Sequence, residues 1–320
     1  MARRIYLAAD LGASSGRWLA GLFDGERLGL EEVHRFPNGG VRVGPRLHWD
    51  LLGQWSHLLD GLRRASSEYA EIRSVGVDTW GVDYGLITND GELLGNPYHY
   101  RDARTSGMME AAFQVMPREE IFRRTGLQFL PFNTLFQLLA AKSSPLLEVA
   151  DRLLMMPDLF HWLLSGEQVN EFTDASTTQC LSAEKRRWDT ELLERFGIPT
   201  RLFGPIAMPG TVLGPLLPEV QRETGLADVQ VVLPGTHDTA SAVVAVPTDR
   251  PLGERPDWCY ISSGTWSLMG VEVPRPVIND KTLALNFTNE GGVGGSVRLL
   301  KNIAGLWLVQ ECRRIWSLRG

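Results

Sequence analysis

The stretch IYLAADLGASSGRWLAGLF, residues 5–23, decides how the chain begins to fold. Residues 5–9 form an apolar run typical of a short buried strand, and residues 18–23 form a second such run. Between them lies DLGASSGR, residues 10–17, whose small glycine and serine side chains leave the backbone amides unobstructed. Asp24-Gly25 then signals a hairpin turn before the next apolar segment. The sequence predicts strand, glycine-serine turn, strand, turn and strand.

Two later strands are predicted to end in polar loops of the same kind. An amphipathic helix over residues 49–70, with Asp50 as its N-cap, precedes a strand at 72–77, which runs into DTWG, residues 78–81. A strand at 229–233 runs into PGTHDT, followed by a helix of small residues at 240–246. Ligands collect beyond the carboxyl ends of strands in open α/β sheets. We therefore expect an α/β fold with a ligand site where these loops meet.

The middle of the chain is predicted to be mostly helical. Residues 84–87 and 92–94 read as a short hairpin, and helical spacing then dominates from 108 to 162 with prolines dividing it into segments. Residues 199–218 hold five prolines, which favours an irregular connection. The helices of this region are expected to surround the sheet and not to add strands to it.

The chain is expected to contain two domains. Residues 1–246 would form the first, and residues 247–256, with three prolines and mixed charge, have the composition of a linker. Residues 257–320 would begin the second by repeating the N-terminal design, with SSGT at 262–265 as the turn between strands and a helix at 302–316. A second domain of about 65 residues is small for a core of its own. The sequence is therefore expected to be truncated.

The composition limits the classes of function. Of the 320 residues, 43% are hydrophobic and 22% charged, which argues against a disordered chain or a coiled coil. A net charge of −6 provides no general attraction to nucleic acid or anionic lipid, so neither is expected as a partner. Three dispersed cysteines favour a reducing compartment, and no apolar run in the sequence is long enough to span a membrane. We expect a cytoplasmic protein.

The two glycine-serine turns are candidate phosphate sites. Several amide N–H groups can converge on one anion in such a turn, although either turn alone could be a simple connection. Because Asp10 and Arg17 flank the first turn and a similar turn recurs at 262–265, we favour a polyphosphate held between them. Asp10 would bind Mg²⁺, since hard cations near phosphate prefer carboxylate oxygen.

Other known motifs fit the sequence poorly. No GxxxxGK[ST] or GxGxxG is found, which disfavours a P-loop ATPase and a dinucleotide dehydrogenase. Residues 12–16 match GxSxG, but a serine hydrolase needs a helix after this serine, whereas a strand is predicted here. Ser182 to Lys185 fit SxxK without the partner motifs. The serine hydrolase is the weakest of the hypotheses.

Polar groups at the predicted strand ends suit a polyhydroxylated ligand. Asp78 and the pair His237-Asp238 can accept hydrogen bonds from hydroxyl groups, while Trp80 could cover C–H faces or simply pack in the core. Asn302 reads as the N-cap of the last helix. Gln310, on an otherwise apolar part of that helix, is a candidate contact to a ligand.

Six segments together are similar to the FGGY carbohydrate kinases, and specifically to the members that act on L-rhamnulose. The resemblance runs in order over residues 5–312. It implies an actin/hexokinase-like (ribonuclease H-like) two-domain α/β fold, with the second domain incomplete here. The segments that carry it are DLGASSGR (10–17), DTWGVD (78–83), QFLPFNT (128–134), HDTASA (237–242), SSGTWSLMG (262–270) and LKNIAGLW (300–307).

The resemblance implies ATP-dependent phosphorylation of L-rhamnulose at its C1 hydroxyl, with Mg²⁺. Asp238 would be the catalytic base, and an ordinary Asp pKa of about 3.9 would leave it ionised at pH 7. The ketose would be bound by Gly81, His237, Asp238, Thr239 and Asn302. ATP would be bound by Ala13, Ser14, Ser15, Gly16, Arg17, Thr265 and Gln310.

Two alternatives to this function remain open at the level of sequence. One is another FGGY ketose kinase, acting on fuculose or xylulose. The other is a sugar-binding chain without turnover, since the family continues beyond this sequence into a glycine-rich loop that seats the adenine side of ATP. On that basis the 320-residue chain is expected to bind ketose and to phosphorylate it poorly.

Overall fold

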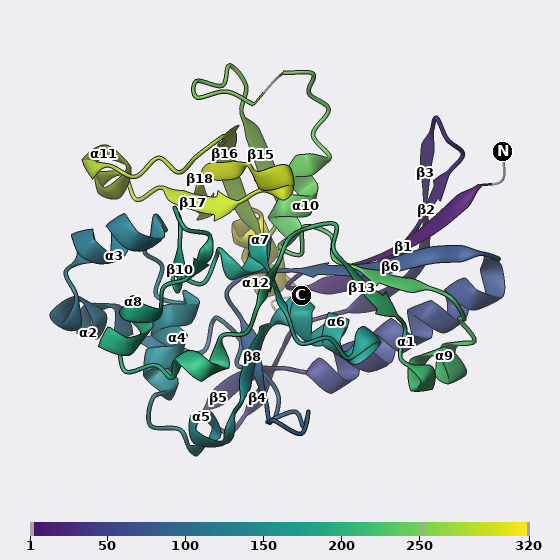
Figure 1. The fold of residues 1–320 in the computed structure, drawn as a ribbon, viewed down its shortest axis with the longest axis horizontal. Coiled ribbons are helices and arrows are strands. Elements are labelled where there is room, and N and C mark those ends of the chain that lie inside the picture. The colour runs from purple at the N-terminus through teal and green to yellow at the C-terminus, as the bar shows by residue number, and fades with distance from the viewer. Residues whose placement is uncertain (1–2, 251, 319–320) are drawn as a thin grey trace.

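Two β-sheets organise the structure, a computed structural model that describes residues 3–250 and 252–318 (Figure 1). The first sheet has six strands in the order β13-β14-β6-β1-β2-β3, and the second has four in the order β15-β16-β18-β17. The first sheet comprises β1 (Arg4–Leu11), β2 (Ser15–Phe23), β3 (Leu28–Pro37), β6 (Ile72–Thr79), β13 (Val212–Pro215) and β14 (Gln230–Val232). The second comprises β15 (Tyr260–Ser263), β16 (Trp266–Val273), β17 (Thr288–Gly291) and β18 (Val297–Ala304).

The remaining strands form short pairs, and the helices surround both sheets. The pairs are β4 (Gly40–Val43) with β5 (Arg46–Trp49), β7 (Tyr84–Ile87) with β8 (Arg152–Met155), β9 (Asn170–Glu171) with β12 (Ile206–Ala207), and β10 (Leu181–Ser182) with β11 (Arg187–Trp188). The α-helices are α1 (Leu51–Glu68), α2 (Met108–Val115), α3 (Arg118–Thr125), α4 (Thr134–Ala141), α5 (Pro145–Val149), α6 (Met156–Ser165), α7 (Phe172–Ala175), α8 (Thr190–Arg195), α9 (Pro218–Thr224), α10 (Asp238–Val244), α11 (Asp280–Ala284) and α12 (Trp307–Ser317). No helix within the described ranges is both long and apolar enough to cross a bilayer.

The N-terminal meander forms as the sequence predicts. β1 pairs with β2 in antiparallel register from Arg4–Phe23 to Leu11–Gly16, and β2 pairs in turn with β3. Asp24 closes the second turn by accepting hydrogen bonds from two following backbone amides, and these contacts lower the pKa of its carboxyl. β1 also lies parallel to β6, which places the carboxyl ends of these two strands side by side.

Helix α1 covers one face of this sheet. The side chain of Asp50 caps it by accepting a hydrogen bond from the Gly53 amide at 3.0 Å, as the sequence predicts. The buried face of the helix includes Leu58 and Leu62, and Gly61 lies against the fully buried indole of Trp18. The close approach of α1 to β2 therefore depends on a missing side chain at position 61.

Replacing Gly61 by alanine should destabilise the protein. A Cβ at this position would lie 1.9 Å from Cδ1 of Trp18, so the indole or the helix must move. Overpacking of this kind costs about 1–3 kcal/mol, which exceeds the gain of about 1 kcal/mol from replacing a helical glycine by alanine. Urea unfolding should show a lower midpoint for Gly61→Ala. Gly39→Ala, where nothing lies within 4 Å of the added carbon, is the matched control and should unfold near wild type.

The middle of the chain departs from the predicted pattern in two places. Residues 152–155 form β8 inside the region predicted as helical, because β8 pairs with β7 and this pairing overrides the local helical spacing. Residues 92–94 form only one bridge, Ile87–Leu93, instead of a strand. The connection at 199–218 also contains the short strands β12 and β13.

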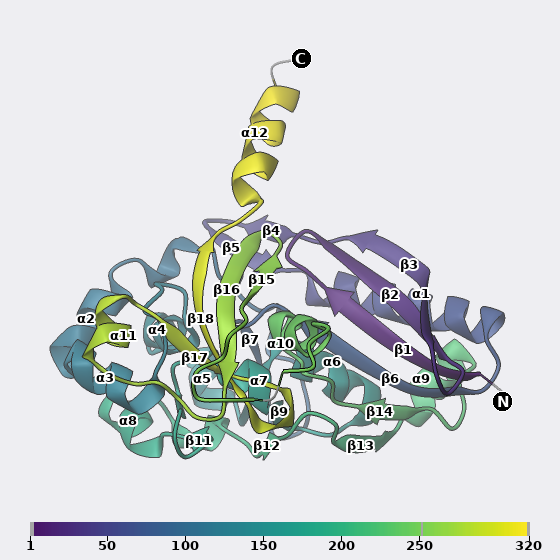
Figure 2. The ribbon, with the colours of Figure 1, turned by 90° about the horizontal axis from the view of Figure 1, so that it is seen from above.

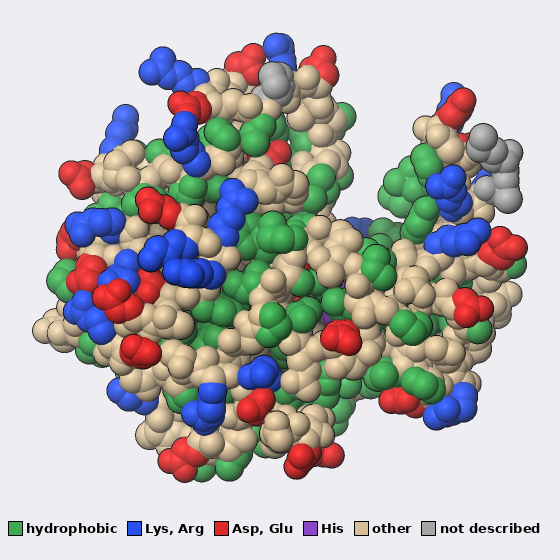
Figure 3. All heavy atoms as spheres, viewed as in Figure 1, with side chains coloured by type: hydrophobic (Ala, Val, Ile, Leu, Met, Phe, Trp, Pro, Cys, Tyr) green, Lys and Arg blue, Asp and Glu red, His purple; other side chains and the backbone are tan. Residues whose placement is uncertain are grey.

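Charged residues of both signs mix over α3 and α8, at the left of Figure 3. Arg124 lies 3.2 Å from the Asp189 carboxylate and 2.6 Å from that of Glu191, and Arg195 lies 2.6 Å from Glu120. Ion pairs at or near the surface contribute little to stability individually, and these range from the partly buried Arg124–Asp189 pair to the exposed Arg195–Glu120 pair. Here they join α3 to the end of the β10-β11 hairpin and to α8.

The prediction that a helix begins at Asn302 is wrong. Asn302 lies within β18, paired with Leu268 of β16, and α12 begins only at Trp307. Strand pairing along the whole of β16 and β18 outweighs the helical spacing of the local sequence. Between β18 and α12, Gly305 lies so near Gly264 and Trp266 that an added Cβ would be 2.6–2.7 Å from their backbone atoms. α12 then projects away from the rest of the molecule, with no buried side chain (Figure 2).

Candidate active site

A cavity of about 740 Å³ is lined by residues of both sheets. The β1-β2 turn contributes Gly12, Ala13 and Ser14, and the β15-β16 turn contributes residues 262–265. Asp238, at the start of α10, lies in the same lining. The two turns and the carboxylate that the sequence singled out therefore share one cavity.

Most of the predicted site residues line this cavity, and two do not. Ser15 and Gly16 begin β2 outside the lining, and their predicted contacts to ATP stay a prediction. Gly16 has a packing role, because a Cβ there would lie 2.2 Å from the ring of Phe36. The predicted residues in the lining are Asp10, Ala13, Ser14, Arg17, Gly81, His237, Asp238, Thr239, Thr265, Asn302 and Gln310.

Parallel strand register brings three aspartates toward the cavity. Asp10 on β1 is paired with Asp78 on β6. One residue further along β6, Thr79 forms a parallel bridge with His237 and donates its backbone N–H to the Thr236 carbonyl at 2.9 Å. Asp238 follows directly, so all three carboxylates line the cavity beyond the ends of neighbouring strands.

These aspartates form an electronegative floor suited to a cation. Arg17 donates two hydrogen bonds, of 2.9 and 2.7 Å, to one oxygen of Asp10. Desolvation, reinforced by the charges of Asp10 and Asp238, raises the pKa of Asp78 well above its usual value. A hard divalent cation would relieve this repulsion, and carboxylate oxygens are the ligands such a cation prefers. The donor set thus fits Mg²⁺.

Asp238 is held at the first turn of α10. Its Oδ1 accepts hydrogen bonds from the amide and the hydroxyl of Thr239 at 2.5 and 3.1 Å. Desolvation raises the pKa of Asp238, opposed by the nearby His237 ring and reinforced by Asp10. The pKa of Asp238 is therefore higher than the ordinary value assumed from the sequence, because the surrounding protein partly desolvates this carboxyl, whose side chain is 38% exposed.

His237 is fixed by two charged residues of the second sheet. Its Nδ1 lies 3.0 Å from Nη2 of Arg298 and 3.3 Å from Oε2 of Glu290. Arg298 is fully buried and also donates to the Gly291 carbonyl at 2.8 Å. Because Nδ1 faces this pair, Nε2 faces Asp238, whose Oδ1 lies 3.5 Å away.

A buried acidic layer supports the loop before His237 from behind. Glu171 Oε2 accepts hydrogen bonds from the amide and hydroxyl of Thr236 at 3.0 and 2.7 Å and from the Thr173 amide at 2.9 Å. Thr173 in turn accepts a hydrogen bond from the His237 amide at 3.2 Å. Burial raises the pKa of Glu171, and it does the same for the neighbouring Asp158 and Asp174. Of the three acids only Glu171 hydrogen-bonds to the loop directly, and none of them belongs to the cavity lining.

Gln128, in the connection between α3 and α4, joins this part of the cavity lining to Asn302 of the second sheet. The backbone N–H and the side-chain amide of Asn302 donate to Gln128 Oε1 at 2.9 and 3.2 Å. Gly81 faces Thr177, and a Cβ at position 81 would lie 2.9 Å from the threonine side chain. Both Gly81 and Asn302 are thereby held at fixed positions in the lining.

Sequence reasoning did not select Gln128, Glu290 or Arg298 as site residues. Gln128 belongs to one of the segments that carry the family resemblance, which was the available signal. Glu290 and Arg298 lie outside those segments, and they reach His237 only because β17 and β18 pair in the second sheet.

Family comparisons cover both parts of the chain. Residues 5–245 match the N-terminal domain of the FGGY family of carbohydrate kinases, and residues 259–320 match its C-terminal domain. The chain is 47% identical over 315 residues to a rhamnulokinase of Bacteroides thetaiotaomicron, an alignment that covers 98% of this chain and 64% of the relative. It is 48% identical over 316 residues to a rhamnulokinase of Pectobacterium carotovorum, covering 97% and 62%. The chain therefore spans less than two thirds of the length of these relatives.

Solved structures confirm the predicted two-domain fold class. Gluconate kinase from Lactobacillus acidophilus superposes with a TM-score of 0.80 at 18% identity, covering 94% of this chain and 60% of that structure. Xylulose kinase from the same organism gives a TM-score of 0.79 at 18% identity, covering 93% and 60%. At this level of identity the likeness concerns the fold alone.

Proposed function

Because the chain belongs to the FGGY family of carbohydrate kinases, we propose that it transfers the γ-phosphoryl group of ATP to the C1 hydroxyl of L-rhamnulose. The observation that carries the proposal is the shared cavity, in which Asp238 lies with both glycine-serine turns. The choice of L-rhamnulose as the substrate rests on the relatives named rhamnulokinase, which align over nearly the whole chain.

In this proposal Asp238 is the catalytic base. It accepts the proton of the C1 hydroxyl as the oxygen forms its bond to the γ-phosphorus and the bond to the β-phosphate oxygen breaks, releasing ADP. His237, Thr239, Gly81 and Asn302 bind the ketose, with His237 oriented by Arg298 and Glu290. Holding the hydroxyl and the phosphate in line supplies much of the rate enhancement in reactions of this kind.

The two turns would bind the phosphates of ATP from opposite sides. One side of the phosphates would contact the amides of residues 13–16 together with Arg17. The other side would contact Thr265, and Gln310 on α12 would lie further out. Asp10 and Asp78 would hold Mg²⁺, which supplies positive charge to the phosphate oxygens when bound. Arg17 fixes the orientation of the Asp10 carboxylate through its two hydrogen bonds to Oδ2.

We also propose the division into domains and the location that the sequence suggests. Residues 1–246 would form the sugar-binding domain, 247–256 the linker and 257–320 the start of the nucleotide-binding domain. In support, α10 ends at Val244 and β15 begins at Tyr260. A cytoplasmic location, where ATP is available, fits this function.

Titration calorimetry tests the function directly. L-rhamnulose should bind with one site per chain, and an ATP analogue with Mg²⁺ should change its affinity. In a coupled ADP-release assay, L-rhamnulose should give a higher kcat/KM than fuculose or xylulose. A preference for either of those ketoses would reassign the substrate within the family.

A sugar-binding chain without turnover is the second candidate. It is favoured by α12, which carries Gln310 and has no buried side chain to fix the proposed nucleotide contact. It predicts ketose binding that ATP does not alter and no ADP release. Absence of ketose binding would contradict both candidates.

A further inference from the structure

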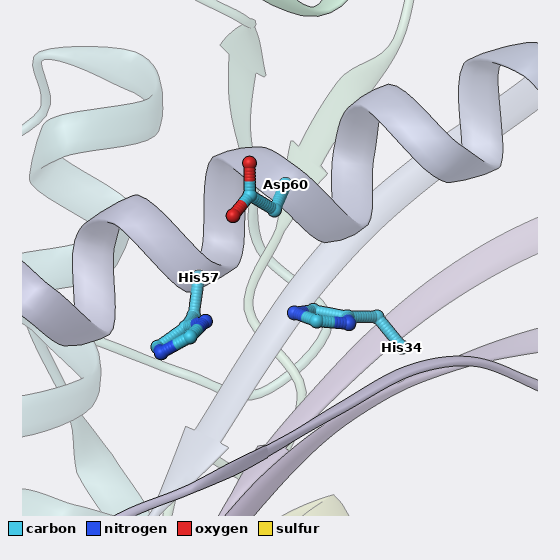
Figure 4. Close-up of side chains that lie close together, drawn as sticks. All are labelled: His34, His57 and Asp60. Atoms are coloured by element: carbon cyan, nitrogen blue, oxygen red, sulfur yellow. The ribbon is translucent and has the colours of Figure 1, made fainter.

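His34, His57 and Asp60 form a cluster apart from the cavity. His34 lies on β3, and His57 and Asp60 lie three residues apart on α1, with the two histidine rings facing each other beside the helix and Asp60 drawn across the helix ribbon (Figure 4). One potential ligand atom from each residue lies within 4.8 Å of the other two. The proposed kinase reaction uses none of them.

The two histidines carry nitrogen atoms that the protein leaves without partners. His34 Nε2 and His57 Nδ1 are both buried, and neither has a hydrogen-bond partner among the described residues. The ring centroids are 5.7 Å apart and the rings point toward each other (Figure 4). Buried polar atoms normally have partners, so two such atoms on facing rings indicate a missing ligand between them.

We propose that His34 Nε2, His57 Nδ1 and a carboxylate oxygen of Asp60 bind one late first-row divalent metal ion, of the type of Zn²⁺. Two imidazoles and a carboxylate are the donors that such ions prefer, whereas Mg²⁺ and Ca²⁺ favour oxygen ligands alone. Zinc–ligand distances of about 2.0–2.2 Å place tetrahedral ligand atoms roughly 3.4 Å apart. The ligand atoms of the cluster, within 4.8 Å of one another, would have to approach to this spacing when the ion binds.

The charges around the cluster make Asp60 the most important of the three ligands for binding a cation. The positive charge of Arg64 lies near His34. Arg63 donates to Asp60 Oδ1 at 2.6 Å, which leaves the second carboxylate oxygen for the metal. Because Arg63 and Arg64 repel a cation, the negative charge of Asp60 is needed to offset them.

The proposed ion would cross-link the edge of the first sheet to its covering helix. His57 stacks on Phe36 with ring centroids 4.6 Å apart, and the same Phe36 ring fills the space beside Gly16. Metal binding would thus stiffen the strand that supports the glycine-serine turn at 12–16. It would act on stability and leave the cavity lining unchanged.

Zinc titration of the metal-free chain tests the site. The experiment uses a Cys259→Ser, Cys312→Ser background, since both exposed thiols are alternative zinc ligands. One Zn²⁺ should bind per chain with a rise in Tm, and Co²⁺ should give a visible spectrum of nitrogen and oxygen ligation. Loss of one ligand, in His57→Gln or in Asp60→Asn, should weaken binding by about 100-fold or more.

His48→Gln is the matched control, because His48 lies outside the cluster, and it should bind zinc like the background chain. His34→Gln should also lose binding, but His34 is buried, so the test relies on the two helix variants, whose folding circular dichroism can check. Failure of the background chain to take up zinc at micromolar concentration would overturn the proposal. So would equal affinity in His57→Gln or Asp60→Asn.

Discussion

Asp238→Asn should lower kcat for ketose phosphorylation by roughly 1,000-fold and leave ketose binding close to wild type. The amide has nearly the same shape and can still accept the hydrogen bonds from Thr239, but it cannot accept the proton of the attacking hydroxyl. General base catalysis typically contributes about 10²- to 10⁴-fold. Steady-state kinetics and calorimetry on the same preparation separate the two effects.

The pH profile gives this prediction a second readout. Since desolvation raises the pKa of Asp238, the acid limb of kcat/KM should lie above the ordinary Asp value of about 3.9, with activity lost as the pH falls through it. That limb should vanish from the residual activity of Asp238→Asn. Asp249→Asn, at a fully exposed side chain, is the control. A variant at position 238 with near-native kcat would remove Asp238 from the role of base.

Arg298→Met should destabilise the fold by about 3–5 kcal/mol and weaken ketose binding. Burial alone would raise the pKa of Glu290, but the hydrogen bond with His237 and the charge of Arg298 lower it below its ordinary value. The Glu290 carboxylate is therefore ionised at neutral pH. Removing Arg298 leaves this buried charge without its cation, which carries a cost of this size. It also frees His237 from one of its two partners.

A double variant distinguishes this mechanism from loss of packing. Arg298→Met with Glu290→Gln removes both charges and should regain much of the lost free energy of unfolding. If the double variant is as unstable as the sum of the two single ones, the charge pair is not what holds this region. Arg275→Met, at an exposed arginine of the same domain, should unfold like wild type.

Local sequence signals predicted the elements whose pattern and pairing agree. The meander of β1 to β3, helix α1 with its Asp50 cap, and the strand before His237 all follow from apolar spacing and turn residues. β8 and Asn302 could not be placed this way, because each adopts a strand only through a partner distant in sequence. Helix was predicted at both places from local apolar spacing alone, because no local signal indicated the distant strand pairing.

The candidate site was predictable where polar residues sit at strand ends. Parallel register then places Asp10, Asp78 and Asp238 together, which the sequence could suggest but not measure. The contacts of Glu290 and Arg298 with His237 depend on how the second sheet docks onto the first, and no short-range pattern encodes that. The raised pKa of Asp238 likewise depends on burial, a property of the assembled molecule.

The acidic layer of Asp158, Glu171 and Asp174 makes proton uptake part of folding. Each carboxyl has a higher pKa in the folded chain than in the unfolded one. By linkage, their contribution to stability is full below the unfolded values near pH 4 and is lost as the pH rises toward the folded ones. Most paired carboxylates have the opposite dependence, so this layer should help to keep the loop before Asp238 folded in mild acid.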